Sequence, residues 1–235
     1  MAFLDECIEF SGPVWQRYLH HPWIEAFFAA ELSQDRFEYW LIQNLSYLGD
    51  HSAELVYTKV PPHNPWVELQ QEYMRRADAS RVELRLLQQY GDEAKMLWSA
   101  RPRRAALINF WNRWAHEGTF GDVCAAYYVC YTFATTFGER YLHEETTGLA
   151  DMQKDWVEQW IDPFSTKLRE ATTAGLNEYG ASGTEYEKEK MRWIFMRATQ
   201  LQIGTFDAAW QLSDPWPGEG KETGVLAGKP SLEEA

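Results

Sequence analysis

Four side chains that could bind a ligand recur at helical spacing early in the chain. Trp40, Asn44, Tyr47 and His51 follow one another at intervals of three or four residues, so a helix would present all four on one face. Lys and Glu are typical of a solvated face, whereas an amide, a phenol and an imidazole beside an indole indicate a partly buried polar surface. This surface could bind a small ligand, or its groups could hydrogen-bond to neighbouring helices.

A cysteine lies in an apolar and aromatic stretch. Cys130 is near the end of the run Ala125–Phe133. Such a cysteine is usually a small hydrophobic residue, and it becomes a nucleophile only when a partner lowers the pKa of its thiol. Cys124 precedes it by six residues and points to another helix face, which argues against a local disulfide. Because the cysteine count of 3 is odd and no signal peptide is evident, we expect a reducing, cytoplasmic location.

A third stripe of candidate residues lies near the C-terminus. Thr199, Gln202, Phe206 and Trp210 recur at helical spacing, with Asp207 beside them. An amide among apolar neighbours can read the donors and acceptors of a ligand, and it can equally bridge two helices.

Two His and carboxylate pairs could bind a metal. His51 with Glu54, and Glu139 with His143, each share one helical face, as in carboxylate-bridged iron sites. The ExxH pairs of di-iron bundles are missing. We therefore predict no metal and no cofactor.

The composition argues against several classes of binding partner. The formal charge of -13 opposes binding to phosphate backbones and anionic membranes, so neither nucleic acid nor membrane is an expected partner. No apolar run reaches the roughly 20 residues of a membrane helix. The chain has 12 Trp, 12 Tyr and 12 Phe, which fits an aromatic-rich core with a subunit interface, or a pocket for a planar ligand.

The periodicity predicts an all-α fold, because apolar residues recur at helical spacing almost everywhere. Residues 1–213 should form one domain, and 214–235 a mobile tail rich in Gly, Pro, Glu and Lys. Breaks are expected at Gly12-Pro13 and at His21-Pro22, and capping boxes at Thr119 and Thr184. The expected helices span about 14–32, 33–60, 66–90, 102–116, 120–145, 152–174 and 185–212.

Several short motifs together resemble the TenA family, the thiaminase II group. Its members share an all-helical, heme-oxygenase-like fold and hydrolyse thiamin or its aminopyrimidine breakdown products. The motifs lie in the order and separation of the family: His21-Pro22-Trp23, Phe37 to Asn44, Val129-Cys130-Tyr131, Phe137-Gly138-Glu139, Trp160 to Phe164, and Phe206 to Trp210. The resemblance implies a single-domain bundle that forms homodimers or homotetramers.

The resemblance assigns roles to individual residues. Cys130 falls on the nucleophile that attacks the pyrimidine and departs after water replaces it, and Tyr47 on the Tyr that supports it and contacts the ring. Asn44 stands where the family has an Asp that binds the aminopyrimidine. Gln202 stands where it has the Glu that handles protons. The other expected substrate-binding residues are Leu107 and Val157, in the places of two pocket tyrosines, with Trp40, Tyr131 and Phe206.

These departures affect the expected chemistry. An amide is no acid or base at neutral pH, and proton transfer typically contributes about 10² to 10⁴-fold to a rate. Asp207, Asp50 or Glu54 could act as the base instead. We therefore expect a pocket for a small planar nitrogen heterocycle, either in a cysteine-dependent C–N hydrolase or in a protein that binds without turnover.

An oxidase of a specialised metabolite is a further alternative, since the PqqC-type oxidases and the heme-oxygenase-like iron oxidases share this fold. Glu83 could match one carboxylate ligand of the iron group. The His expected one turn later is Leu86 or Leu87 instead. No basic pocket for an anionic quinone precursor is evident in so acidic a chain.

Overall fold

The structure is a computed structural model that describes residues 1–47, 52–79, 81–90, 100–144, 146–161 and 163–218. All regular structure in these ranges is helical, as predicted. The N-terminal elements are α1 (Phe3–Leu19), α2 (Pro22–Phe28), α3 (Gln34–Asn44), and the 3₁₀ helices η1 (Leu45–Tyr47) and η2 (Ser52–Lys59). The others are α4 (Trp66–Asp78), α5 (Arg81–Tyr90), α7 (Pro102–Glu117), α8 (Phe120–His143), α9 (Asp151–Glu158), α10 (Pro163–Ser182) and α11 (Glu185–Gln211).

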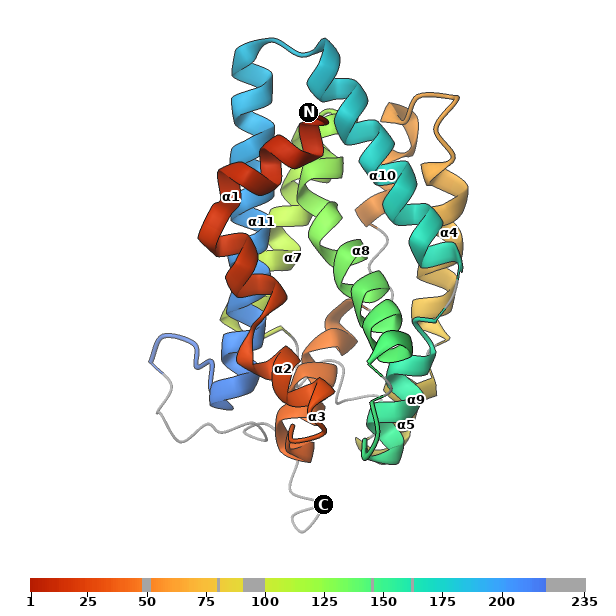
Figure 1. The fold of residues 1–235 in the computed structure, drawn as a ribbon, viewed down its shortest axis with the longest axis vertical. Coiled ribbons are helices and arrows are strands. Elements are labelled where there is room, and N and C mark those ends of the chain that lie inside the picture. Colours follow the sequence, from red (N-terminus) through yellow and green to blue (C-terminus); the bar gives the residue numbers. More distant parts are fainter. Residues whose placement is uncertain (48–51, 80, 91–99, 145, 162, 219–235) are drawn as a thin grey trace.

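Helix α8 runs through the middle of the bundle (Figure 1) and packs against α7, α9, α10 and α11. A helix that is apolar on every side must be buried, and α8 is buried over nearly its whole length from Phe120 to Gly138. It begins at the predicted capping box, in which Thr119 accepts a hydrogen bond from the Asp122 N–H and the Asp122 carboxylate accepts one from the Thr119 N–H. Lys190 of α11 pairs with the same carboxylate at 2.8 Å. These hydrogen bonds and the ion pair fix the N-terminal end of α8, the central helix.

The two N-terminal breaks are confirmed. Gly12 kinks α1 with a φ of 42°, a conformation that glycine adopts without a steric penalty. His21 is the N-cap of α2, and its Nδ1 accepts the Trp23 N–H at 3.1 Å. Pro22 follows as the first helical residue, where its missing N–H costs nothing.

The long helix expected over 33–60 is instead three shorter elements, so that prediction is wrong. Ser46 donates a side-chain hydrogen bond to the Gln43 carbonyl at 2.7 Å, a local bond that competes with the helical ladder. Lys59 then holds η2 in place, because its ammonium group donates to the carbonyls of Ala115, His116 and Gly118 at the end of α7. The helix expected over 66–90 is likewise divided, into α4 and α5.

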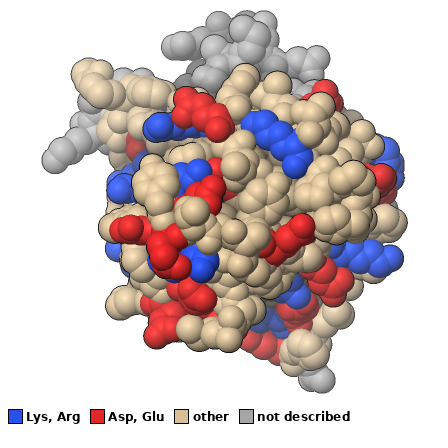
Figure 2. All heavy atoms as spheres, turned by 90° about the horizontal axis from the view of Figure 1, so that it is seen from above, with Lys and Arg blue, Asp and Glu red and all other residues tan. Residues whose placement is uncertain are grey.

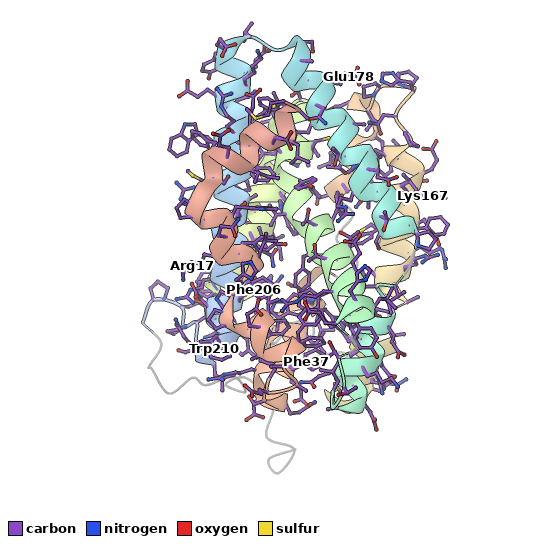
Figure 3. All side chains as sticks on the ribbon, viewed as in Figure 1. Arg17, Phe37, Lys167, Glu178, Phe206 and Trp210 are labelled. Carbon is purple, nitrogen blue, oxygen red and sulfur yellow. The ribbon has the colours of Figure 1, made fainter. Side chains whose placement is uncertain are left out.

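Aromatic rings from five helices form a continuous cluster in the lower half of the bundle, where Figure 3 labels Phe37 and Phe206. Trp40 of α3 stacks on Phe206 of α11 with 6.0 Å between ring centroids and 7° between planes. Phe133 of α8 lies 5.1 Å from Trp40 and 5.3 Å from Phe206. Trp23 of α2 and Trp156 of α9 each lie 5.3 Å from Trp40. Much of the aromatic excess therefore joins helices that are distant in sequence.

The surface and the C-terminal segment complete the fold. Acidic and basic side chains are interspersed over the end of the bundle that Figure 2 shows. Asp214, the first residue of the predicted tail, is buried and accepts the Arg103 N–H at 2.7 Å. The division of the chain after residue 213 stays a prediction. Among the described helices, none combines the length and the apolar character needed to cross a bilayer.

Two helical glycines give opposite predictions for stability. A Cβ on Gly180 of α10 would lie 2.1 Å from Cγ of Phe3, whereas a Cβ on Gly204 of α11 would lie no closer than 3.7 Å to Arg103. We expect Gly180→Ala to lower the free energy of unfolding by about 1–3 kcal/mol through overpacking. Gly204→Ala should raise it by about 0.4–1 kcal/mol, because the unfolded chain loses freedom. Urea unfolding of both variants tests this, and equal effects would contradict the packing of α1 on α10.

Candidate active site

A cavity of about 120 Å³ lies beside α8, between α3, η2, α4, α5, α7 and α11. An apolar cavity of about 150 Å³ holds one benzene molecule, so the space suits a single six-membered ring. Seven aromatic side chains line its wall. They are Trp40, Tyr73, Trp111, Tyr127, Tyr131, Phe133 and Trp160.

The polar lining residues come from seven different elements. They are Asn44, Ser52, Gln70, Glu83, Arg104, Cys130 and Gln202. A mostly apolar wall with a few convergent polar groups is typical of a small-molecule site.

The Cys130 thiol is one of these polar groups. Its Sγ lies 3.9 Å from the Tyr73 hydroxyl, which can hydrogen-bond to it. Burial raises the pKa of the thiol to about 11, while the Tyr73 hydroxyl and the Arg104 guanidinium act in the opposite direction. At neutral pH the thiol is therefore almost entirely protonated. A nucleophilic role requires further stabilisation of the thiolate or removal of its proton once a ligand is bound.

Tyr73 of α4 is held by aromatic and polar contacts. Its ring meets Tyr131 edge-on at 5.6 Å and lies 5.9 Å from Trp160. The Tyr131 hydroxyl in turn donates to Gln70 Oε1 at 2.7 Å. Tyr73 was not among the residues that we expected at the site. The spacing of Gln70, Tyr73 and Ala77 on one helical face could have indicated it.

The two amides at the site differ in their partners. Asn44 Oδ1 is buried with no hydrogen-bond partner among the described residues, so it can accept from a ligand donor. Gln202 Nε2 donates to the Thr205 hydroxyl at 3.2 Å, one turn away on α11. Asn44 is therefore the amide that is better placed for ligand recognition.

Two buried side chains of opposite formal charge also line the cavity. Arg104 of α7 is 2% exposed and its guanidinium carbon lies 5.5 Å from the centre of the Trp40 ring. Glu83 of α5 is 5% exposed. The sequence suggests Glu83 only as a possible iron ligand. Its burial at the cavity wall makes it a candidate for proton transfer.

The structure brings five of the expected site residues together. Trp40, Asn44, Cys130, Tyr131 and Gln202 all line the cavity. Their proposed roles stay predictions.

The other expected site residues lie elsewhere. Leu107, Val157 and Phe206 are completely buried and belong to the hydrophobic core around the cavity rather than to its lining. The backbone of Tyr47 ends η1, but its side chain falls outside the described part of the chain, as do His51 and Asp50.

Asp207 does not line the cavity, although we considered it as a base. Its carboxylate accepts from Arg17, labelled in Figure 3, at 2.9 Å. His21 lies 3.1 Å away through Nε2, and because Nδ1 accepts the Trp23 N–H, Nε2 carries the proton and donates. Asp207 therefore joins α11 to the α1–α2 corner. Glu54, the other candidate base, is exposed and also lies outside the lining.

Of the two His and carboxylate pairs, the structure describes only Glu139 with His143 in full, because His51 lies outside the described residues. Glu139 is paired with Arg169 at 2.9 Å, and His143 is exposed. No cluster of three or more His, Cys, Asp or Glu side chains suited to a metal occurs in the part of the chain that the structure describes.

The contact between Tyr73 and Cys130 predicts how the thiol titrates. Alkylation of Cys130 by iodoacetamide should keep accelerating from pH 8 towards pH 11, because only the thiolate reacts. Tyr73→Phe removes the hydroxyl that lowers the pKa, so the variant should react several-fold more slowly at each pH. Tyr179→Phe, a change outside the cavity, is the control. An alkylation rate that reaches a plateau below pH 8 would contradict the burial of the thiol. Equal rates in Tyr73→Phe and the wild-type protein would contradict the contact between Tyr73 and Cys130.

Comparisons with known proteins agree with this architecture. The model of the TENA/THI-4/PQQC family matches residues 11–211. The aminopyrimidine aminohydrolase of Bacillus subtilis is 23% identical over 222 residues, which cover 90% of this chain and 91% of that protein.

Solved structures share the fold at low identity. A TenA homologue from P. horikoshii superimposes with a TM-score of 0.71 at 17% identity, covering 89% of this chain and 99% of the other. A protein from Silicibacter described as a TenA family transcription regulator gives a TM-score of 0.73 at 19% identity, covering 88% and 96%. With the family match spanning most of the sequence, this all-α chain is a member of the TENA/THI-4/PQQC family.

Proposed function

We propose that this protein is a cysteine-dependent hydrolase that cleaves the exocyclic C–N bond of a small aminopyrimidine. The observation that carries the proposal is the Cys130 thiol in the wall of an aromatic cavity that suits one six-membered ring. The similarity to the Bacillus subtilis aminopyrimidine aminohydrolase supports the same class of reaction.

The net reaction consumes one water molecule. The Cys130 sulfur attacks the pyrimidine, the exocyclic C–N bond breaks, and the amine leaves with a proton. Water then displaces the sulfur, so that its hydroxyl stays on the carbon and Cys130 regains its proton. Desolvation opposes the first step because the pKa of the resting thiol is about 11.

The lining residues can offset that cost. The Tyr73 hydroxyl and the Arg104 guanidinium stabilise the thiolate through a hydrogen bond and through charge. Glu83 is the carboxylate among the described lining residues, so it is the candidate to exchange protons with the leaving amine or with water. Asn44 Oδ1 can accept a hydrogen bond from the amino group of the ring.

A protein that binds the heterocycle without turnover is the second candidate. The raised pKa of Cys130 and the two amides at 44 and 202 favour it, because neither amide can transfer a proton at neutral pH. Such a protein would be stabilised thermally by the ligand and release no product.

Product release separates the two candidates. We expect the wild-type protein to release the hydroxymethyl pyrimidine from its aminomethyl analogue or from thiamin, and Cys130→Ala to lose at least about 10³-fold in rate, as expected for loss of a nucleophile. Chromatography of the products is the measurement. Cys130→Ser controls for the size of the side chain. Binding without product in the wild-type protein would favour the second candidate.

Exposed aromatic rings support our proposal that the chain forms a homo-oligomer. Trp193 is 48% exposed, Phe10 is 40% exposed, and their rings meet edge-on at 5.2 Å at the α1–α11 contact. Tyr186 of α11 is 75% exposed. Aromatic residues are enriched at subunit interfaces.

Light scattering tests the oligomer directly. The expected mass is a multiple of the 27.5 kDa of the chain, and Trp193→Glu should lower it by burying a charge in the interface. Glu189→Gln on the same helix is the control. A wild-type mass of 27.5 kDa would overturn the proposal.

A further inference from the structure

A second cavity of about 350 Å³ adjoins the first, between the C-terminal half of α4, α9 and the beginning of α10. Among the described residues, Tyr73, Ala77 and Trp160 line both cavities. The Tyr73 and Trp160 rings, with centroids 5.9 Å apart, therefore stand between the inner cavity of Cys130 and the outer one.

The two cavities differ in chemistry. The inner wall carries seven aromatic side chains and one charged side chain of each sign, whereas two basic and two acidic side chains line the outer cavity. Arg75 and Arg76 lie on one side and pair with Glu72 of their own helix. Asp155 and Glu158 of α9 lie on the other side. The outer cavity is suited to water and to polar groups, and the inner one to a flat ring.

Trp160 is held firmly at this boundary. It follows α9, and its backbone N–H donates to the Val157 carbonyl at 3.0 Å. Its backbone carbonyl packs closely on Gly138 of α8. A Cβ on Gly138 would lie only 2.7 Å from the Trp160 carbonyl oxygen. Its ring also meets Trp156 edge-on at 6.3 Å. Because backbone and ring are both fixed, the indole acts as a wall with little freedom to swing away.

The reacting atoms lie next to this wall. The Cys130 sulfur is 3.9 Å from the Tyr73 hydroxyl, and Tyr73 is itself one of the shared lining residues. A ring attacked by Cys130 would therefore have a bond that breaks near Tyr73. A small amine can leave from there, whereas a second ring attached at the same position must pass Trp160 into the outer cavity.

We propose that Trp160, together with Tyr73, restricts this protein to one-ring aminopyrimidines that carry a small leaving amine and discriminates against two-ring compounds such as thiamin. The inference rests on the proposed function. Its geometric basis is the size of the inner cavity, about 120 Å³, which accommodates one ring but not two. Trp160 is thus a specificity-determining residue.

Binding measured by calorimetry tests the inference without requiring turnover. The wild-type protein should bind the hydroxymethyl pyrimidine at least about tenfold more tightly than thiamin. Trp160→Leu opens the inner cavity to the outer one, so it should reduce this ratio at least about fivefold. Trp114→Leu is the matched control, because Trp114 lines neither of the two cavities and its removal changes the size of neither. The control should leave the ratio within about twofold.

A second pair of probes separates failure of the inference from failure of the proposed function. 4-Methylpyridine and 4-benzylpyridine share one ring and differ by a second ring on the methylene carbon. If no pyrimidine compound binds, yet Trp160→Leu alone admits 4-benzylpyridine, the proposed substrate is wrong and the size restriction stands. Equal binding of one-ring and two-ring probes by the wild-type protein would overturn the inference. The inference would also be overturned if Trp114→Leu changed the ratio as much as Trp160→Leu does, or if no one-ring probe bound at all.

Discussion

The rest of the structure depends on the burial of α8. Helices α7, α9, α10 and α11 pack around α8, and the desolvation that follows raises the pKa of Cys130 to about 11. The same packing places the thiol beside a mainly aromatic cavity. The packing that buries the site therefore also limits the reactivity of Cys130. A site that excludes water from a bound ring also favours the neutral thiol over the thiolate.

The residues that stabilise the bundle and those that line the cavity are partly the same. Trp40 stacks on Phe206 within the aromatic cluster and also forms part of the cavity wall. Tyr73 packs on Tyr131 and Trp160, and its hydroxyl reaches the Cys130 sulfur. A rigid wall costs little further ordering when a ligand binds, which favours a preorganised site of fixed size.

The sequence predicted the helical class, the breaks at Gly12 and His21 and both capping boxes, because these follow from local chemistry. It could not predict that Leu107, Val157 and Phe206 lie behind the cavity, since periodicity identifies a buried face without telling core from pocket. Tyr73 and Cys130 are 57 residues apart, so their contact depends on how α4 packs. Side-chain hydrogen bonds of Ser46 and Lys59 accompany the 3₁₀ segments, and residue spacing alone does not reveal them.

The central claim is that the cavity beside α8 holds the heterocycle next to Cys130. A crystal structure of the protein with the hydroxymethyl pyrimidine tests it most directly. The account predicts the ring inside the inner cavity, in contact with the Cys130 sulfur, with its amino group on Asn44 Oδ1 and its substituent directed towards Tyr73. A ring bound in the outer cavity, or one that contacts neither Cys130 nor Asn44, would contradict the account.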